Sequence, residues 1–320
     1  MKTVGVSQFG GPEALRVFEV PEPHAGPGQV RIRVYAATVN PGDRYLRIGA
    51  VRPASPAPPY VPGMEAAGVL DEIGSDTETG GLRVGDRVMA MADPTSPLGG
   101  AYAQYVVLPV EQVARAPRGT THAEAATLPM NGLTARLAVD LAGLSPGQTL
   151  AVTGAPGAVG GYVIQMAKAD GLTVVADAAP ADEGLVRSFG ADIVVPRGAD
   201  VARYILQAVP GGAAGLIDAA VIGSAAMASA VHDGGVIVTL LGEGNRALSP
   251  DEMRRRYLRL RMAFVPDYLG DRSRLDRLRD QVEAGDLTLR VARTFPPEQA
   301  AEAHRLMEAG GVRGRLVLEF

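Results

Sequence analysis

Strand-like and helical runs alternate over residues 121–265, and this alternation restricts the fold more than any other feature of the sequence. Short apolar runs such as TLAVT, TVVAD and GVIVTLL are separated by longer stretches with helical spacing. Alternation of this kind predicts a parallel sheet whose strands are joined by right-handed crossover helices. The helices are expected to begin near Ala158, Asp182, Ala199, Ser224 and Pro250.

The segments on either side of this region have a different organisation. Up to about residue 120, short β-rich runs such as QVRIRVYAATV and DRVMAMA are separated by Gly and Pro clusters, which predicts a compact, mainly antiparallel sheet or barrel. The tail contains a strand, a helix and a last strand that most simply rejoin the N-terminal sheet. We therefore expect one domain made of residues 1–120 and 266–320, with an α/β domain of residues 121–265 inserted between its two parts.

The turn after the first strand of the α/β region, in the stretch TGAPGAVGG, is rich in glycine. Gly157 and Gly160 fit the second and third glycines of the dinucleotide motif G-x-G-x-x-G, and Ala155 takes the place of the first. Gly157 would let the backbone approach a pyrophosphate, and Gly160 would let the helix pack on the strand. The N–H groups of Ala158 and Val159 would then face the phosphates. Such turns also occur for packing reasons alone, so the surrounding strand–helix units carry part of this prediction.

The residues favour a nicotinamide dinucleotide and leave its form open. An NAD site has an acidic residue at the end of the second strand, where it accepts the ribose hydroxyls. Asp177 is near this position but one residue early, which would turn its side chain to the other face of the strand. Ala178 follows it. Arg187 and Arg197 are the nearest cations, and Arg197 is the candidate partner for a 2′-phosphate.

Composition narrows the classes of partner and of chemistry. The 320 residues include no cysteine, which excludes disulfides, thiolate nucleophiles and a four-cysteine zinc site. A net charge of -4 offers no basic surface for nucleic acid or for an anionic membrane. The N-terminal segment lacks the features of a secretory signal, and no window is apolar enough for a membrane span, so a cytoplasmic protein is expected. Its ligands are expected to be small molecules.

Several motifs, in order along nearly the whole chain, resemble the zinc-free quinone oxidoreductases of the medium-chain dehydrogenase/reductase superfamily. They include YVPGMEAAGVLDEIG, GAYAQYVVLP, LPMNGLTARLAV, GAPGAVGGYVIQMAKADG and GGVRGRLVL. The resemblance implies a GroES-like β-barrel catalytic domain and a Rossmann cofactor domain with a doubly wound parallel sheet. It also implies hydride transfer from NADPH, with NADH possible, to a small, apolar, electron-poor acceptor: a quinone or an α,β-unsaturated carbonyl.

The zinc-dependent relatives of this family bind a catalytic zinc ion through a Cys from a Cys-x-x-Asp motif and a His from Gly-His-Glu. In this chain those positions hold Asn40 and Met64, and neither side chain is a plausible zinc ligand. We therefore expect no metal site. Glu65 is kept from the second motif and is interpreted as a polar structural residue.

By the same resemblance, the stretch NPGDRYLRIG lines the catalytic cleft. Asn40, Asp43 and Tyr45 would lie near the nicotinamide, where a neutral amide or phenol can polarise a carbonyl oxygen and Tyr45 can relay a proton. The alternative for Tyr45 is a half-buried tyrosine of the barrel. Arg47 is interpreted either as a surface ion-pair residue or as a ligand contact. On the cofactor side, the resemblance adds Thr134, Leu241 and Gly242.

The run RMAFVPDYL is predicted to be the edge strand of the parallel sheet, next to a strand from Val236 to Leu241. Its residues Met262 to Val265 are apolar. A bare apolar edge promotes pairing, and the resemblance points to the same edge, so a homodimer joined across this strand is expected. The alternative is an edge covered by the arginine-rich segment before it. In place of the expected activity, the chain could be a trans-acting enoyl reductase for carrier-bound thioesters, or a non-enzymatic dinucleotide-binding regulator.

Overall fold

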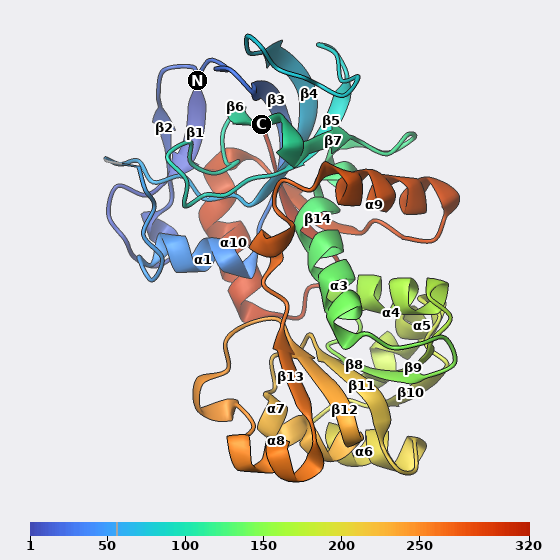
Figure 1. Cartoon of the computed structure of the whole chain (residues 1–320). Coiled ribbons are helices and arrows are strands. Elements are labelled where there is room, and N and C mark those ends of the chain that lie inside the picture. The colour runs from blue at the N-terminus through green and yellow to red at the C-terminus, as the bar shows by residue number, and fades with distance from the viewer. Residues whose placement is uncertain (56) are drawn as a thin grey trace. The chain divides into compact units, whose positions relative to one another are not determined.

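The computed structural model describes residues 1–55 and 57–320 and contains two compact units (Figure 1). The predicted fold class is confirmed: a GroES-like unit, here called unit 1, and a Rossmann unit with a six-stranded parallel sheet, here called unit 2. Unit 1 comprises Met1–Met130, Tyr268–Gly285 and Leu289–Phe320. Unit 2 comprises Asn131–Asp267 and Asp286–Thr288.

Unit 1 is built on a mainly antiparallel sheet. Its strands are β3 (Gln29–Thr38), β4 (Glu65–Ile73), β5 (Arg87–Met91), β6 (Tyr105–Pro109), β7 (Val113–Arg115), β14 (Val291–Phe295) and β15 (Arg315–Glu319). The sheet order is β14-β15-β3-β4-β5-β7, with β6 paired to β3 as well. Because β15 pairs with β3, the last strand rejoins the N-terminal sheet, as the sequence predicts. A separate antiparallel pair is formed by β1 (Lys2–Gly5) and β2 (Arg16–Glu19).

The described part of unit 1 also contains α-helices, and the last of them in the list below leads into unit 2. They are α1 (Pro41–Arg47), α2 (His122–Ala126), α9 (Arg272–Ala284), α10 (Ala300–Ala309) and α3 (Pro129–Ala142), whose first two residues belong to unit 1. Helix α1 begins directly after β3 because Pro41 suits the first helical position and the carboxylate of Asp43 accepts the N–H of Asn40. It therefore stands at the end of the longest strand of the sheet.

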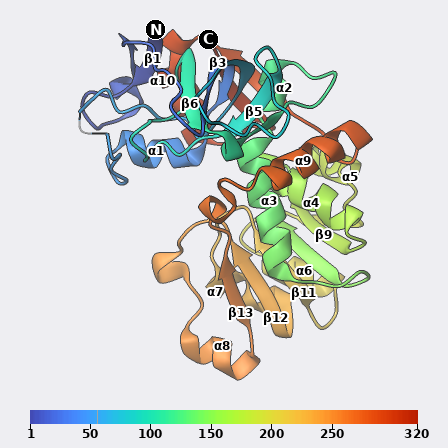
Figure 2. The same cartoon turned by 45° about the horizontal axis from the view of Figure 1, so that its top comes forward.

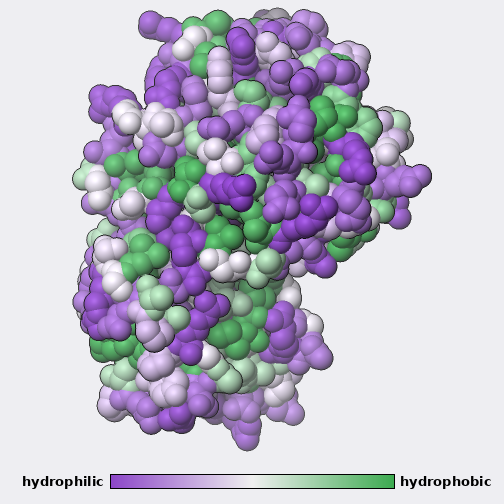
Figure 3. Space-filling view, turned by 180° about the vertical axis from the view of Figure 1, so that it is seen from behind, coloured by the Kyte–Doolittle hydropathy of each residue, from purple (hydrophilic) through white to green (hydrophobic). Residues whose placement is uncertain are grey.

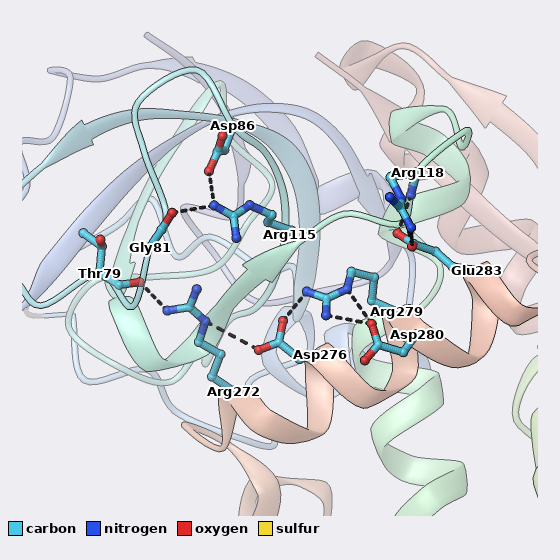
Figure 4. A network of polar contacts seen from close by, with 10 residues as sticks. All are labelled: Thr79, Gly81, Asp86, Arg115, Arg118, Arg272, Asp276, Arg279, Asp280 and Glu283. Carbon is cyan, nitrogen blue, oxygen red and sulfur yellow. Dashed lines mark hydrogen bonds and ion pairs between the residues drawn. The ribbon is translucent and has the colours of Figure 1, made fainter.

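Polar contacts attach helix α9 to other segments of unit 1 (Figure 4). At its N-terminal end, Arg272 donates a hydrogen bond to the main-chain oxygen of Thr79. Near its C-terminal end, Glu283 forms an ion pair of 2.6 Å with Arg118. Further ion pairs along the helix connect Asp276, Arg279 and Asp280. The charged residues of this helix therefore pair with one another along the helix and, at its two ends, contact Thr79 and Arg118.

Unit 2 contains the predicted alternation of strands and helices. Its strands are β8 (Thr149–Thr153), β9 (Thr173–Ala178), β10 (Ile193–Pro196), β11 (Ala213–Asp218), β12 (Val231–Thr239) and β13 (Arg259–Met262). Its helices after α3 are α4 (Ala158–Ala169), α5 (Glu183–Ser188), α6 (Val201–Ala208), α7 (Ser224–Met227) and α8 (Pro250–Arg256). All neighbouring strands are parallel in the order β10-β9-β8-β11-β12-β13, and β11, β12 and β13 lie side by side in Figures 1 and 2. The order reverses between β8 and β11, which is where open sheets of this type bind ligands.

The edge strand differs from its prediction. Instead of RMAFVPDYL, the strand β13 spans Arg259–Met262, with Arg259 opposite Val236 of β12. The prediction placed the strand on the apolar run, but β13 pairs with β12 through backbone hydrogen bonds, which any side chain allows. A strand at a free edge therefore does not need an apolar sequence. Arginine side chains on an edge also discourage unspecific pairing.

Polar side chains are interspersed with apolar ones on the face of the protein seen in Figure 3. Among the described residues, no helix has both the length and the apolar character that a membrane crossing requires. Each unit has a hydrophobic core of its own. The core of unit 1 includes Ile32 and Leu70, and the core of unit 2 includes Val175 and Leu216.

Candidate active site

The glycine turn of unit 2 joins β8 to α4. Gly157 caps α4 in an extended conformation, and Ala158 and Val159 open the helix, where main-chain N–H groups lack intrahelical partners. A Cβ atom on Gly160 would lie 2.3 Å from the carbonyl oxygen of Gly154, so no larger residue fits there without moving the turn. On Gly157 it would approach the same oxygen only to 3.0 Å. The turn has the geometry of an anion site at a helix N-terminus, and its residues fit a dinucleotide pyrophosphate.

Asp177 faces this turn. Its carboxylate is buried and accepts the N–H of Ala155 at 3.0 Å, which ties the end of β9 to the start of the turn. Burial raises the pKa of Asp177, while the hydrogen bonds from the turn and the nearby charge of Arg197 oppose that rise. Asp177 thus anchors the turn through hydrogen bonds from the main chain of the turn.

The other predicted cofactor residues lie in or near the strand ends and in α3. Ala178 is the buried last residue of β9, and its carbonyl accepts the main-chain N–H of Arg197 at 3.0 Å. The Arg197 side chain is exposed. Leu241 and Gly242 follow the end of β12 and line a hollow of about 1010 Å³ beside α8 and β13. Thr134 is buried in α3.

Asn40 is enclosed by hydrogen bonds in unit 1. Its amide nitrogen donates to Thr38 Oγ1 and to Glu65 Oε1, both at 3.1 Å, and its amide oxygen accepts from Arg315. An amide has two N–H groups, so both are used. With an exposure of 1% as well, Asn40 offers no free donor to a carbonyl while these contacts hold.

Asp43 is also fully buried. Oδ1 accepts the N–H of Gly63 at 2.8 Å, and Oδ2 accepts the N–H of Asn40 at 2.8 Å and the hydroxyl of Tyr102 at 3.0 Å. Burial raises the pKa of Asp43 to about 6, against these hydrogen bonds and the charge of Arg315. Its position indicates that Asp43 holds the start of α1 in place.

Tyr45 differs from its two neighbours. It is half-buried on α1, and within the described part of the chain its hydroxyl group has no hydrogen-bond partner. Of the three predicted catalytic residues, Tyr45 is therefore the one whose polar group remains available to a ligand.

The structure adds a polar row that the sequence does not reveal and that is buried except for its outermost member, Glu308. Tyr102, His304, Arg47 and Glu308 follow one another from Asp43 outward, at 3.3 Å, 3.2 Å and 2.6 Å between successive members. Arg47 does form an ion pair, as one interpretation has it, but its side chain runs from α1 to Glu308 of α10 and the residue is 1% exposed, so it is not a surface residue. Its interpretation as a ligand contact stays a prediction. No local sequence signal could have found the row, because His304 lies 257 residues after Arg47.

The residues at the former zinc positions do not fit a metal ion. The polar atoms of Asn40 are engaged, and the sulfur of Met64 lies so close to Gly42 of α1 that a Cβ there would be 2.5 Å from it. Glu65 is buried and forms an ion pair with Arg315 at 3.8 Å. Among the described residues, no group of three or more His, Asp or Glu side chains could hold a metal.

The proline-dense stretch of residues 52–60 includes Pro56, which lies outside the described residues. Of its neighbours, Arg52 lies over the ring of Phe9 at 5.0 Å, and Tyr60 stacks on the same ring at 5.2 Å.

Two family sequence models match the chain. The model described as "Alcohol dehydrogenase GroES-like domain" matches residues 26–118, all within unit 1. The model described as "Zinc-binding dehydrogenase" matches residues 189–318, which include part of unit 2 and the last strands of unit 1.

Curated relatives include reductases of quinones and of enones. A quinone oxidoreductase QR1 from Triphysaria versicolor is 35% identical over 61% of this chain and 60% of its own length. A trans-enoyl reductase from Aspergillus terreus is 36% identical over 62% of the chain and 70% of its own length. An NADPH-dependent alkenal/one oxidoreductase from Arabidopsis thaliana is 29% identical over 99% of the chain and 79% of its own length. The chain thus spans less than two thirds of the Triphysaria protein.

A solved mycobacterial structure in complex with NADPH matches the whole of both chains with a TM-score of 0.87 and 25% sequence identity. This agreement extends over both units. The chain therefore belongs to the medium-chain dehydrogenase/reductase superfamily, as a quinone oxidoreductase-like member of a family whose typical cofactor is a nicotinamide dinucleotide.

Proposed function

We propose that this protein transfers hydride from NADPH to a quinone or to an α,β-unsaturated carbonyl without a metal ion. The observation that carries the proposal is the chemistry at the former zinc positions, where Asn40 is enclosed by hydrogen bonds and Met64 packs on α1. Negative charge on the acceptor must then be spread by the acceptor's own conjugation and met by neutral donors. Quinones and enones satisfy this condition, whereas simple ketones do not.

The proposed cofactor is NADPH, with NADH as the alternative. NADPH supplies the hydride, and the N–H groups of Ala158 and Val159 would hold its pyrophosphate at the start of α4. Asp177 is engaged with the turn, which disfavours the ribose contact of an NAD site. Arg197 follows the adjacent strand end and is the proposed partner of the 2′-phosphate. The NADPH named for the Arabidopsis relative and the mycobacterial structure supports this choice.

We expect Tyr45→Phe to lower kcat by about 100-fold. Among the three predicted catalytic residues, Tyr45 is the one whose polar group remains available to donate a hydrogen bond to the acceptor, and the substitution removes that group. The fold should persist, since that hydroxyl has no partner to lose among the described residues. Steady-state kinetics with a quinone and with an enone test this. Tyr105→Phe, in β6 of the same unit, is the matched control and should keep native kcat. A Tyr45→Phe enzyme with native kcat would remove Tyr45 from the mechanism.

The activity is tested by a panel of quinones, enones and simple ketones with NADPH and NADH, followed by the absorbance of the reduced nicotinamide. Oxidation of NADPH by conjugated acceptors but not by simple ketones is expected. Turnover of carrier-bound enoyl thioesters alone would favour a trans-acting enoyl reductase, the activity named for the Aspergillus relative. Tight cofactor binding without turnover by any acceptor would favour a non-enzymatic regulator.

We further propose that the protein is a cytoplasmic homodimer joined across the free edge of β13. Directly opposed residues of two antiparallel strands have their side chains on the same face of the sheet, and successive residues alternate between faces. In a symmetric pair of β13 strands, the twofold axis must therefore lie between the two copies of one residue, which face each other. An axis at Leu260 or Arg261 would set arginine against arginine, which is unfavourable. An axis at Met262 sets Arg261 opposite Ala263 and covers the exposed Met262 and Phe264.

Met262→Lys should therefore give monomers, because it sets two like charges face to face at the axis. Leu206→Lys replaces another exposed apolar residue of unit 2, on α6, and should leave the dimer intact. Sedimentation equilibrium of both variants at micromolar concentration decides between them. A native protein that sediments as a monomer would end this proposal without affecting the catalytic one.

A further inference from the structure

The buried row between Asp43 and Glu308 has its hydrogen-bond directions set by one residue. Arg47 has only donors, and its Nη1 lies 3.2 Å from His304 Nδ1, so Nδ1 accepts and the imidazole is neutral with its proton on Nε2. That N–H points to the hydroxyl oxygen of Tyr102 at 3.3 Å. The single O–H of Tyr102 is then directed to Asp43 Oδ2 at 3.0 Å.

The surroundings of the row keep these directions in place. Glu308 accepts from Arg47 at 2.6 Å and holds the guanidinium against His304. Burial, followed by the charge of Arg47, lowers the pKa of His304 to about 3, so the imidazole stays neutral near pH 7. Burial raises the pKa of Tyr102 well above its usual value, and the adjacent Asp43 adds to the effect. Neither ring therefore titrates in the working range of an enzyme.

Asp43 at the inner end of the row receives only donors. The N–H groups of Asn40 and Gly63 and the hydroxyl of Tyr102 all point to its oxygens, and the charge of Arg315 acts from β15. Such an arrangement fits an ionised carboxylate, because a protonated carboxyl group would direct its own O–H toward a donor. Of these three donors to Asp43, two are main-chain N–H groups, and the Tyr102 hydroxyl is the one that belongs to a side chain.

We propose that Tyr102 and His304 are positioning residues that hold Asp43 in its ionised form and thereby keep α1, with Asn40 and Tyr45, in its active geometry. The inference rests on the proposed function. A proton on Asp43 would place an O–H against one of the donors that its oxygens accept, and this weakens the hydrogen bonds that close the start of α1, two residues before Tyr45. Activity therefore has an acid limit set by Asp43, and the Tyr102 hydroxyl, together with the N–H groups of Asn40 and Gly63, lowers the pH at which that limit lies.

The test compares the native protein with Tyr102→Phe in two measurements. The first follows the carboxyl carbon of Asp43 by NMR in protein with labelled aspartate, assigned by its loss in Asp43→Asn. The native midpoint is expected at about pH 6. Without the Tyr102 hydroxyl it should rise by about one unit. The second measures kcat/KM against pH, and its acid limb should move up by the same amount while activity at high pH stays near native.

Matched variants separate positioning from other roles. His304→Gln offers an acceptor to Arg47 and a donor to Tyr102, so it should keep both midpoints. His304→Leu removes both the acceptor for Arg47 and the donor to Tyr102, so it should raise the NMR midpoint of Asp43 and the acid limb of kcat/KM. This variant also tests the proposal if Tyr102→Phe does not fold. Tyr105→Phe should change neither.

Three results would overturn the proposal. The Asp43 midpoint could stay unmoved when its side-chain donor is lost, or activity could fall by one factor at every pH. Inactive His304→Gln with a native midpoint would show that the imidazole carries protons. If no acceptor were reduced at all, the proposed function would fail, while the NMR midpoints would still decide the role of the row.

Discussion

Arg47→Met should lower the free energy of unfolding of unit 1 by about 3 kcal/mol, because it removes the cation from a buried network. The Arg47 side chain is 2% exposed, and its loss leaves His304 Nδ1 and the carbonyl oxygen of Gly10 without a donor. Glu308 remains partly solvated and keeps a second arginine, which limits the cost. Hydrogen exchange of the amides of α10 and β15 measures the effect within unit 1.

Arg44 provides the matched control on the same helix. It pairs with the same carboxylate, Glu308, at 3.4 Å, but its side chain is 45% exposed. Arg44→Met should therefore cost less than about 1 kcal/mol, as exposed ion pairs do. Equal losses for the two substitutions would show that burial of Arg47 contributes nothing to stability.

Gly160→Ala should abolish tight NADPH binding, with a loss of about 100-fold or more, and should also destabilise unit 2. The added Cβ would lie 2.3 Å from the carbonyl oxygen of Gly154 and 2.9 Å from the Cα of Ala155. Both atoms belong to the backbone of the turn, so the turn itself must shift. Overpacking of this kind costs about 1 to 3 kcal/mol and moves the N–H groups meant for the pyrophosphate. Calorimetric titration with NADPH and thermal unfolding measure the two effects.

Gly157→Ala controls for the loss of a glycine from the same turn. Its φ of -68° suits any residue, and the nearest atom to the new Cβ is the Gly154 oxygen at 3.0 Å. Unit 2 should keep nearly native stability in this variant, with a smaller loss of NADPH affinity. If Gly160→Ala bound NADPH as well as Gly157→Ala does, the close packing of α4 on the turn would have no part in cofactor binding.

Local patterns were enough to predict the architecture of unit 2. Helices begin at Ala158, Ser224 and Pro250 as expected, because the signals that start them lie within a few residues. The edge strand was misplaced because its position depends on register with β12. That register is set by backbone pairing and does not appear in the side chains of Arg259–Met262.

The candidate site of unit 1 could be predicted only in part. Motif resemblance identified Asn40, Asp43 and Tyr45, but it could not tell which polar group is free, since that depends on distant partners. Arg315 reaches Asn40 across 275 positions of sequence. Burial of Arg47 depends likewise on a helix near the end of the chain, and no spacing rule relates residues so far apart.

The position of Arg315 has a consequence for synthesis of the protein. Ribosomes release residues 1–130 long before β15, so Asn40 and Glu65 must first exist without the arginine that contacts both. The complete segment of unit 2 from Asn131 to Asp267 emerges in the interval. Domains generally fold as they emerge, so unit 2 can fold first, and the unit that begins the chain is finished last. A nascent chain halted before β15 therefore carries Glu65 without the arginine that pairs with it in the finished protein.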